Sequence, residues 1–397
     1  MNEMNAISDP SSILVPHNIW DLYRPDAAMF LATPAHTLLA ADPAEAIPHA
    51  HTPLATRVAE ALRRAQANGY AGAAVVGAVP FDADTPAALR VAHTMLRAAP
   101  SGVPRVPEPS GMRYATREVP AADAYGDAVA HAVARIRAGE LDKVVLARTL
   151  EVDGEQSVDV APLVARLAAR NPHGYTFSVD LGAGCTLLGA SPELLVNRFG
   201  GVVRANPLAG SAPRSADPVE DRRRAEALLD SAKDLDEHRV VVEAVRDSLA
   251  PFCSHLDVPA RPSLMHTETM WHLSTEVRGE TQADALTLAL ALHPTPAVCG
   301  APRDAARACI RAAEPFDRGF YAGMLGWVDT RGDGEWIVTI RCAQAFDRTL
   351  RLYAGAGVVA ESTPDGERAE TAAKFRTMLD ALGIRHDAAS GGAREAA

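Results

Sequence analysis

Segments with a helical period alternate along this chain with short strand-like runs, and this alternation limits the folds open to it. Apolar residues recur every three or four positions in segments that close at Asn68-Gly69, Gly139 and Asn171-Pro172, as amphipathic helices do. The stripes are Leu54, Val58, Leu62 and Ala65; Tyr125, Val129, Val133 and Ile136; and Leu163 and Leu167. Strand-like runs lie at 143–152, 175–180, 335–341 and 349–353. Because these runs are β-branched and often half-polar, the pattern favours antiparallel sheets with helices outside, an α+β fold, over a parallel doubly wound sheet.

Two further helices are indicated by their ends. Ser231 has the character of an N-cap, with Asp234 three residues later as in a capping box, and the helix is expected to run to about Leu249. A last helix should begin near Glu367 and end near Leu382-Gly383.

Two stretches resemble linkers. Prolines recur without apolar periodicity at 98–109, which could separate an N-terminal section from a catalytic one but is favoured here as a long surface loop. The tail from about Asp387 is small and polar and is expected to be disordered. The prediction is therefore a single domain over 1–385, with its core motifs at 120–385 and a disordered tail at 386–397.

Charge and cysteine content exclude several classes of protein. The formal net charge is −11 and no block of Lys or Arg stands out, so no nucleic-acid or membrane-surface partner is expected. The five cysteines are scattered without a C-x-x-C pair, which argues against a disulfide framework or a structural zinc site. The N-terminus lacks the pattern of a signal peptide, and no window has the ~18 uninterrupted apolar residues of a membrane-spanning helix. We expect a cytoplasmic enzyme that binds any anionic ligand through a metal or a local cationic pocket.

Two acidic pairs could meet at a hard cation. Asp234 and Glu237 are three residues apart and share one helical face, and Glu367 and Glu370 repeat that spacing, with Lys374 continuing their face. Mg²⁺ prefers oxygen ligands and usually takes only one or two carboxylates directly. Each pair alone also has an ordinary interpretation, because Asp234 can simply cap a helix and Glu370–Lys374 can be a surface ion pair.

Two other charged residues lie where an acid–base pair could form. Lys143 begins a strand and shares a face with Val145 and Ala147, so it is either a strand-edge residue or, if buried, a general base. Glu193 follows a Ser-Pro turn between strand-like residues, which places its carboxyl group at a strand end. A solvated turn glutamate is the alternative interpretation of Glu193.

Small residues mark two possible ligand loops. Gly355 and Gly357 follow the run 349–353, where backbone N–H groups could hold an anion, and Arg341 ends the neighbouring run, where it could bind a carboxylate. The segment 206–211 (NPLAGS) is equally ambiguous, and glycine-containing loops usually mark only a turn. His272 could be a core histidine bonded to backbone.

Ten motifs taken together resemble the chorismate-utilising enzymes, in the family's order and over about 141–374. They are LDKVVLAR from Leu141, GASPEL from Gly189, NPLAGSAPR from Asn206, SAKDLDEH from Ser231, MWHLST from Met270, LHPTPAVCG from Leu292, EPFDRGFYAGMLGW from Glu314, TIRC from Thr339, YAGAGVV from Tyr353 and GERAETAAK from Gly366. The segment 76–82 (VGAVPFD) adds a weaker likeness. The resemblance implies a four-layer α/β/β/α fold, with two packed sheets flanked by helices and the active site in a cleft between them.

The resemblance also implies roles for the residues singled out above. Mg²⁺ would be held by Glu237 and Glu370, with Asp234 and Glu367 supporting it through water. Lys374 and the N–H groups around Gly355–Gly357 would hold the ring carboxylate of chorismate, and Arg341 the enolpyruvyl carboxylate, with Tyr353 and Ile340 nearby. The implied substrate-binding residues are Gly210, Ala297, Val298, Arg341, Tyr353, Gly355, Ala356, Gly357 and Lys374; the implied catalytic residues are Lys143, Glu193 and His272.

Within this family the chain is most similar to members that convert chorismate into isochorismate, and a monomer is expected. Lys143 resembles their water-activating base, Ala209 stands where aminodeoxychorismate synthases carry a lysine, and Ala297 stands where salicylate synthases usually have threonine. Lys143 would deprotonate a water that attacks ring C2, and a protonated Glu193 would donate to the departing C4 hydroxyl. The product would feed siderophore (2,3-dihydroxybenzoate), salicylate or menaquinone synthesis. Alternatives are a salicylate synthase, an aminating subunit with a glutaminase partner, and a non-catalytic family subunit.

Overall fold

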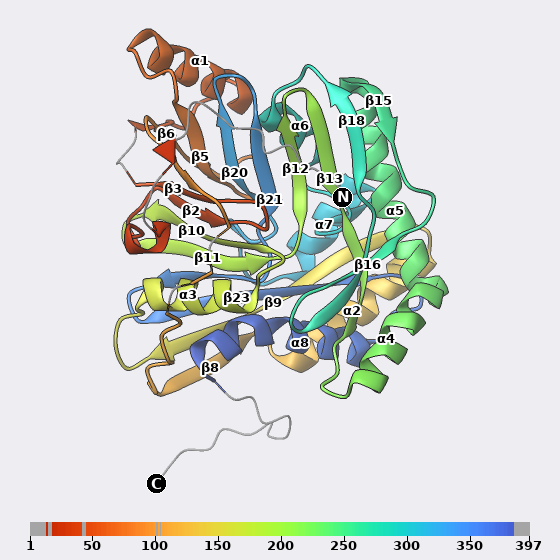
Figure 1. The fold of residues 1–397 in the computed structure, drawn as a ribbon. Helices are drawn as coiled ribbons and strands as arrows, with labels where there is room; N and C mark the ends of the chain where they lie inside the picture. Colours follow the sequence, from red (N-terminus) through yellow and green to blue (C-terminus); the bar gives the residue numbers. More distant parts are fainter. Residues whose placement is uncertain (1–12, 15–17, 42–44, 101, 104, 385–397) are drawn as a thin grey trace.

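The computed structural model describes residues 13–14, 18–41, 45–100, 102–103 and 105–384. Within these residues the chain forms two large sheets, one of 11 and one of 9 strands, and a small sheet of 3 strands (Figure 1). Neighbouring strands are antiparallel throughout the described part, apart from the parallel pair of the first strand with the seventh. The antiparallel α+β prediction is therefore confirmed.

The large sheet brings together strands from both ends of the chain. Its order is β1 (Ile13–Leu14), β7 (Leu96–Ala98), β3 (Thr37–Ala40), β2 (Met29–Ala32), β10 (Tyr175–Gly182), β11 (Cys185–Ser191), β22 (Cys342–Phe346), β23 (Thr349–Val358), β9 (Lys143–Gly154) and β19 (Gly300–Ala301), and β8 (Tyr114–Val119) also pairs with β9. Strand β9 is thus flanked by β23 on one edge and by two shorter strands on the other.

The second sheet packs against the first. Its order is β15 (Cys253–Asp257), β18 (Val277–Thr281), β13 (Val202–Asn206), β12 (Leu194–Phe199), β21 (Gly334–Val338), β20 (Met324–Asp329), β5 (Ala74–Val79), β6 (Ala88–Ala92) and β4 (Glu45–Ala46). The small sheet has the order β14 (Leu208–Pro213), β17 (Met270–Ser274) and β16 (Ser263–His266).

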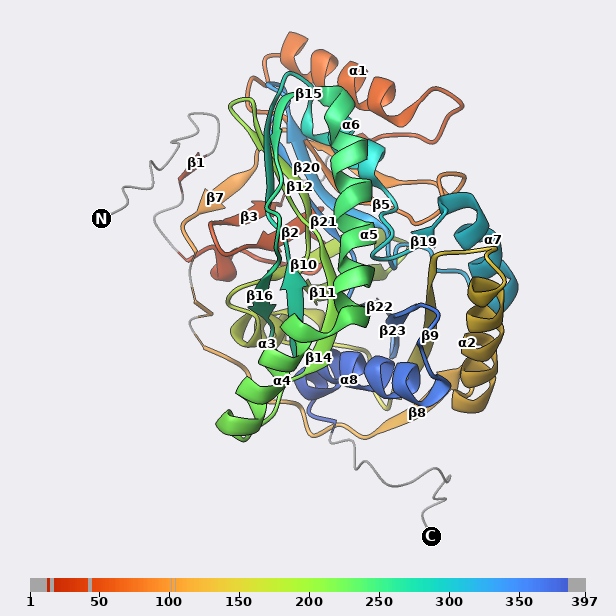
Figure 2. The ribbon, with the colours of Figure 1, turned by 90° about the vertical axis from the view of Figure 1, so that its right-hand side faces the viewer.

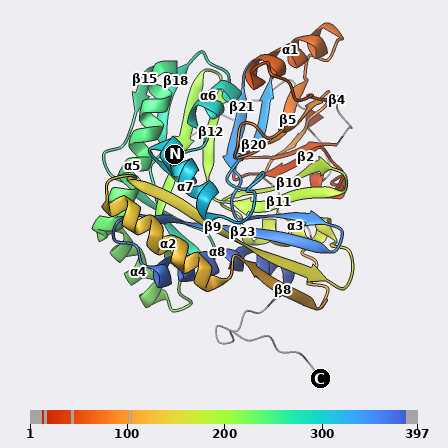
Figure 3. The same cartoon turned by 180° about the vertical axis from the view of Figure 1, so that it is seen from behind.

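Helices cover the outer faces of both large sheets. They are α1 (Leu54–Ala67), α2 (Ala122–Arg137), α3 (Val160–Arg170), α4 (Pro218–Asp230), α5 (Ala232–Leu249), α6 (Ala285–Leu292), α7 (Arg303–Ala313) and α8 (Pro364–Leu382), with 3-10 turns at Ile19–Asp21 and Ala250–Phe252. Helices α2, α3 and α8 pack on the large sheet, and α1 and α6 pack on the second sheet. Figure 2 shows the long α5 near one end of α8, and Figure 3 shows α2 and α7 in front of β9, on the face turned to the viewer. This arrangement confirms the four-layer expectation.

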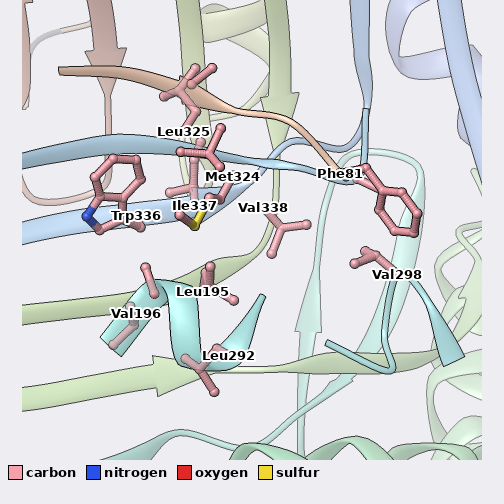
Figure 4. Packing of buried hydrophobic residues seen from close by; sticks show 14 of the residues in the cluster. Phe81, Leu195, Val196, Leu292, Val298, Met324, Leu325, Trp336, Ile337 and Val338 are labelled. Carbon is pink, nitrogen blue, oxygen red and sulfur yellow. The ribbon is translucent and has the colours of Figure 1, made fainter. Parts of the chain in front are cut away.

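Two apolar cores hold the layers together. The larger one lies between the sheets and includes the fully buried Trp327 and Trp336, and the smaller one lies under α3 and α8. Figure 4 shows Leu292 of α6 packed beneath Leu195 and Val196 of β12. Because strands β20, β21 and β5 are buried along their whole length, they have no solvent-facing side.

Most predicted elements are confirmed, and three limits need correction. The helix expected from Glu367 begins at Pro364, because Thr363 caps it by accepting from the Gly366 N–H (3.2 Å). The run 335–341 ends as a strand at Val338, where the Ile340 N–H donates back to the Val338 carbonyl (3.0 Å), and Arg341 beyond it has a left-handed backbone with φ of 50°. Strand β23 continues through Gly355-Ala356-Gly357, which were expected to follow it as a loop.

The first hundred residues add strands to both large sheets, and the stretch 98–109 connects β7 and β8 of the same sheet. We therefore propose that the predicted single domain includes this N-terminal part. The tail predicted to be disordered (386–397) lies outside the described residues. In the part of the chain that the structure describes, no helix is long and apolar enough to cross a membrane.

Candidate active site

Lys143 lies at the start of β9, almost completely buried, and faces α5. Its Nζ atom forms an ion pair of 2.8 Å with Glu237 Oε1. Gly357 on the neighbouring strand makes room for this pair, because a Cβ atom at that position would lie 2.4 Å from Glu237 Oε1 and 2.9 Å from Lys143 Cε. The interpretation of Lys143 as an exposed strand-edge residue is therefore wrong.

Glu237 belongs to a group of four carboxylates from two helices. Asp234 and Glu237 come from α5, where Ser231 caps the helix by accepting from the Asp234 N–H (3.3 Å), and Glu367 and Glu370 come from α8. The spacing of three residues keeps each pair on one helical face, as the sequence predicted. The carboxylates influence one another's ionisation, so the two helices converge.

The acidic groups differ in how their charge is balanced. Burial raises the pKa of Glu367, and the nearby Glu370 raises it further, although Lys233 lies 3.4 Å away. Burial also raises the pKa of Asp234. Burial acts in the same direction on Glu237, but the charge and hydrogen bond of Lys143, together with the charges of Lys233 and Lys374, hold the pKa of that carboxyl group below its usual value.

The donor set suits a hard divalent cation. Within the described residues, no three His, Cys, Asp or Glu side chains approach closely enough to form a metal site alone. Mg²⁺ does not need such a cage, because it commonly keeps several waters and takes one or two carboxylates together with substrate oxygens. Burial, with added repulsion from neighbouring carboxylates, raises the pKa values of Glu367 and Asp234, and a bound cation relieves this kind of imbalance.

Glu193 lies in the corner between β11 and β12, where the Ser-Pro turn was expected to place it. Its N–H donates to Ser191 Oγ (3.2 Å) and its carbonyl accepts from the Val338 N–H (3.1 Å). Burial raises the pKa of Glu193 to about 8, even though Lys143, Arg341 and Lys374 act to lower it. The carboxyl group is therefore protonated near neutral pH, as a proton donor must be.

Arg341 approaches the same region from the segment between β21 and β22. Its left-handed backbone turns the side chain inward, where only 5% of the residue is exposed, and Nη1 has no hydrogen-bond partner among the described residues. Burial lowers the pKa of Arg341 to about 10. An unpaired buried guanidinium nitrogen is costly, which is consistent with a place kept for an anionic ligand.

One pocket collects most of the predicted substrate-binding residues. Its lining is Val145, Ala297, Val298, Tyr321, Ile340, Arg341, Tyr353, Ala354, Gly355 and Lys374. Tyr321 and Tyr353 stack in this wall with ring centroids 5.0 Å apart. The pocket is therefore apolar and aromatic on one side and cationic at Arg341 and Lys374.

Lys374 ties α8 to the glycine strand. Its Nζ atom donates to the Gly355 carbonyl (2.8 Å) and pairs with Glu370 (2.6 Å). Strand β23 pairs with β22 only as far as Leu352, so from Tyr353 onward its edge on that side faces the pocket. By the alternation of a strand, the Ala356 methyl points to the opposite face from Gly355 and Gly357, so Ala356 can act only through its backbone.

His272 and Gly210 close the site from the small sheet. His272 on β17 is buried, and its Nε2 atom has no hydrogen-bond partner among the described residues. Burial keeps the pKa of His272 well below 6.5, with Arg341 and Lys374 adding to the effect, so the ring is neutral. Gly210 lies against α5 with φ of 75°, and a Cβ atom there would be 3.0 Å from Asp234 Cβ.

Two neighbours of the site were not singled out from the sequence. Lys233 sits between the acidic groups, and its only signal was its place inside the SAKDLDEH run. Buried His238 bonds the Ala209 carbonyl through Nδ1 (3.2 Å) and Thr275 Oγ1 through Nε2 (2.7 Å), which holds β14 against α5. Arg368, which lies between Glu367 and Glu370 in the sequence, instead pairs with Asp123 at 2.9 Å on the outer surface.

Comparison with known proteins gives concordant results. Residues 62–383 match the family described as "Chorismate binding enzyme". The chain is 50% identical to isochorismate synthase DhbC of Bacillus subtilis, over 97% of this chain and all of that protein. It is 40% identical to isochorismate synthase EntC of Escherichia coli, over 84% of this chain and 87% of that protein.

Similar solved structures agree with the sequence relatives. A crystal structure described as a putative 2,3-dihydroxybenzoate-specific isochorismate synthase, DhbC from Bacillus anthracis, has a TM-score of 0.87 and 48% identity, covering 92% of this chain and 99% of that chain. Anthranilate synthase component I from Streptococcus pneumoniae shares the fold, with a TM-score of 0.67 at 21% identity over 90% of each chain.

Proposed function

Since this chain belongs to the chorismate binding enzyme family, we propose that it converts chorismate into isochorismate in a Mg²⁺-dependent reaction. The observation that carries the proposal is a buried lysine close to a buried, protonated carboxyl group: the charge of Lys143 acts on Glu193, as do those of Arg341 and Lys374, which line the pocket. Adding water at one ring carbon and removing hydroxyl from another requires one base and one acid, and these two groups supply them.

The substrate's two carboxylates have separate partners in this proposal. Arg341, with its unpaired Nη1, binds the enolpyruvyl carboxylate beside Tyr353. Lys374 and the backbone of Gly355–Gly357 hold the ring carboxylate. Val298 and Ala297 line the pocket from the segment before β19, and neutral His272 supplies a polar group from the small sheet.

The proposed proton transfers use these two groups. In the proposed reaction Lys143, as the neutral amine, removes a proton from water, whose oxygen attacks ring C2, and the ring double bonds shift. Glu193 gives its proton to the C4 hydroxyl, which leaves as water, so the product is an isomer of the substrate. Each proton-transfer group is expected to contribute about 10²–10⁴ in rate.

The metal proposal rests on Glu237 and Glu370 as direct ligands, with Asp234 and Glu367 behind them. When bound, Mg²⁺ would orient the ring carboxylate and neutralise the acidic cluster. The negative charge of Glu237 would then be balanced by the metal as well as by Lys143. The lysines that balance these carboxylates in the structure, Lys143, Lys233 and Lys374, support the idea that the cluster needs positive charge.

The resemblance to the 2,3-dihydroxybenzoate-specific relative supports siderophore synthesis as the use of the product. The test is incubation of the purified protein with chorismate and Mg²⁺, with and without ammonium, followed by chromatography and mass detection. A new species of unchanged mass, lost on adding EDTA and restored by Mg²⁺, is expected. Salicylate with pyruvate, an ammonium-dependent product, or no turnover would each contradict the proposal.

A further inference from the structure

One edge of β9 lacks a strand partner beside the pocket. Strand β19 pairs with β9 only at Lys143 and Val144, and β8 pairs with it only from Thr149 onward. Between them, the Val145 N–H donates to the carbonyl of Cys299, just before β19 (2.9 Å), but the Val145 carbonyl and the Ala147 N–H have no neighbouring strand. Buried backbone N–H and C=O groups require partners, so something else must replace a strand there.

A buried ion pair takes that place. The Ala147 N–H donates to Glu314 Oε1 (2.8 Å), and Arg318 Nη2 donates to the Val145 carbonyl (2.7 Å). Glu314 ends α7 and Arg318 follows four residues later, and their side chains, 3% and 2% exposed, pair at 2.6 Å. One acceptor and one donor at this spacing reproduce the pattern of a neighbouring strand with side chains alone.

The guanidinium of Arg318 also contacts other residues of the pocket lining. Arg318 Nη1 donates to the Val298 carbonyl (2.8 Å), and its carbon lies 4.6 Å from the Phe81 ring centroid and 5.7 Å from that of Tyr321. Figure 4 shows the Phe81 and Val298 side chains facing each other. Val145, Val298 and Tyr321 all line the pocket, so one buried cation contacts three residues of its lining.

The pair also controls the path of β9 toward the reacting groups. Lys143 lies two residues before Val145 on the same face of that strand, and Val145 and Ala147 are paired with Gly357 and Gly355. A shift of β9 at this point would therefore move the base and the glycine strand together. Small displacements of this kind are enough to reduce rates by about 10².

We propose that Glu314 and Arg318 are positioning residues that act as a substitute strand for β9 and set the distance between Lys143 and the pocket walls. Neither side chain lines the pocket, so they act through Val145, Ala147 and Val298. The proposal rests on the function proposed above. It also explains why an ion pair is kept here, since buried pairs are a poor source of stability compared with well-packed apolar side chains.

The test compares Arg318→Lys with a matched substitution elsewhere. Lysine keeps the charge but cannot bond Val145, Val298 and both oxygens of Glu314 at once. Arg224→Lys is the control, because Glu220 and Arg224 form another i,i+4 pair whose guanidinium also bonds two backbone carbonyls, but away from the pocket and with the Arg224 side chain 36% exposed. Both variants would be assayed with chorismate and Mg²⁺, and their folded fraction measured by circular dichroism.

For Arg318→Lys we expect kcat per folded molecule to fall ten- to hundredfold, with the Mg²⁺ concentration for half-maximal activity unchanged, because the acidic residues on α5 and α8 do not contact the pair. Arg224→Lys should match the wild type in kcat and in Mg²⁺ response. A kcat for Arg318→Lys within twofold of wild type would overturn the inference.

Glu314→Gln is the second variant, to be used if the first fails to fold. It keeps an oxygen for the Ala147 N–H but turns an amide donor toward Arg318, so an intermediate fall in kcat, with Mg²⁺ response unchanged, is expected. A loss of folded protein with normal kcat in the remainder would show a purely structural role and contradict the proposal. Wild-type protein without turnover would instead contradict the proposed function, so the two failures are distinguishable.

Discussion

The corner that carries Glu193 and the face of α5 that carries Glu237 present the same side chain in two electrostatic settings. Both carboxyl groups are buried, and burial favours the neutral form of each. At Glu237 the ion pair with Lys143, 2.8 Å away, and the charges of Lys233 and Lys374 together exceed the effect of burial, and the pKa is lowered. At Glu193, Lys143 acts without an ion pair, burial prevails and the pKa rises to about 8.

The difference shows that neighbouring charge, and not burial alone, decides what a carboxyl group can do. A lowered pKa gives Glu237 a permanent negative charge, which suits a metal ligand. A raised pKa keeps a proton on Glu193, which suits an acid. The same site therefore supplies an anion and a proton donor from one residue type, because only one of them has a cation at hydrogen-bond distance.

Removing Lys143, whose ion pair makes the pKa of Glu237 differ from that of Glu193, should have the largest effect. Lys143→Ala removes the proposed base and leaves Glu237 without its ion pair, so we expect turnover to fall by about 10³–10⁴, the upper part of the range for a proton-transfer group. Chromatography measures the loss of isochorismate formation, and calorimetry measures chorismate binding by the variant. Lys233→Ala is the comparison, because Lys233 is partly exposed and its distance to Glu367, 3.4 Å, is longer than the 2.8 Å between Lys143 and Glu237. Activity of Lys143→Ala within tenfold of wild type would exclude the base role.

Replacing the protonated partner should be nearly as severe and should change the pH profile. Glu193→Gln is expected to reduce turnover by about 10²–10⁴. In the wild type, kcat/KM should decline as pH rises through about 8, because the acid must be protonated to donate. The variant's residual activity should lack this decline. If the decline persists unchanged, another group is the acid.

Crowding the ion pair should produce a moderate loss. Gly357→Ala places a methyl group 2.4 Å from Glu237 Oε1, which forces Lys143 and Glu237 apart, and a loss of roughly ten- to hundredfold in kcat is expected. Gly102→Ala is a suitable control, since a Cβ atom there meets nothing within 4 Å. Equal activities of the two variants would show that the close approach at Gly357 is unimportant.

The smallest effect concerns stability. The raised pKa of Glu193 means that the folded state holds a proton that the unfolded chain releases, so this group's contribution is present below about pH 4.5 and is lost as pH rises toward 8. Glu193→Gln removes this dependence. Its melting temperature relative to wild type should therefore rise between pH 5 and pH 8, by about 2 °C or more. Glu155→Gln, at an exposed position, should show no such trend.

Local signals in the sequence predicted local structure well. The helix that begins at Leu54 and the cap at Ser231 are confirmed, because an apolar stripe and a capping side chain are properties of neighbouring residues. The position of Glu193 at a strand end is also confirmed, since a Ser-Pro turn interrupts a strand wherever it occurs.

Other features depend on residues far apart in the chain. Nothing near Arg341 signals its left-handed backbone, and strand β23 continues through Gly355 and Gly357 because β9 pairs with it there. Glu314 and Arg318 were part of a recognised motif without an assigned task, since their backbone partners on β9 lie more than 160 residues earlier. The roles of the site residues remain predictions, which the substitutions above would test.

The pairing of early with late strands also bears on synthesis of the protein. Strand β5 completes its side of the sheet only when β20 has been made, and α8 supplies Glu370 and Lys374 after every strand. A nascent chain on the ribosome therefore exposes unpaired edges for most of translation, which is the situation in which chaperones are needed. A chain cut before α8 could retain many strands, yet it would lack half of the acidic cluster and the lysine that holds Gly355.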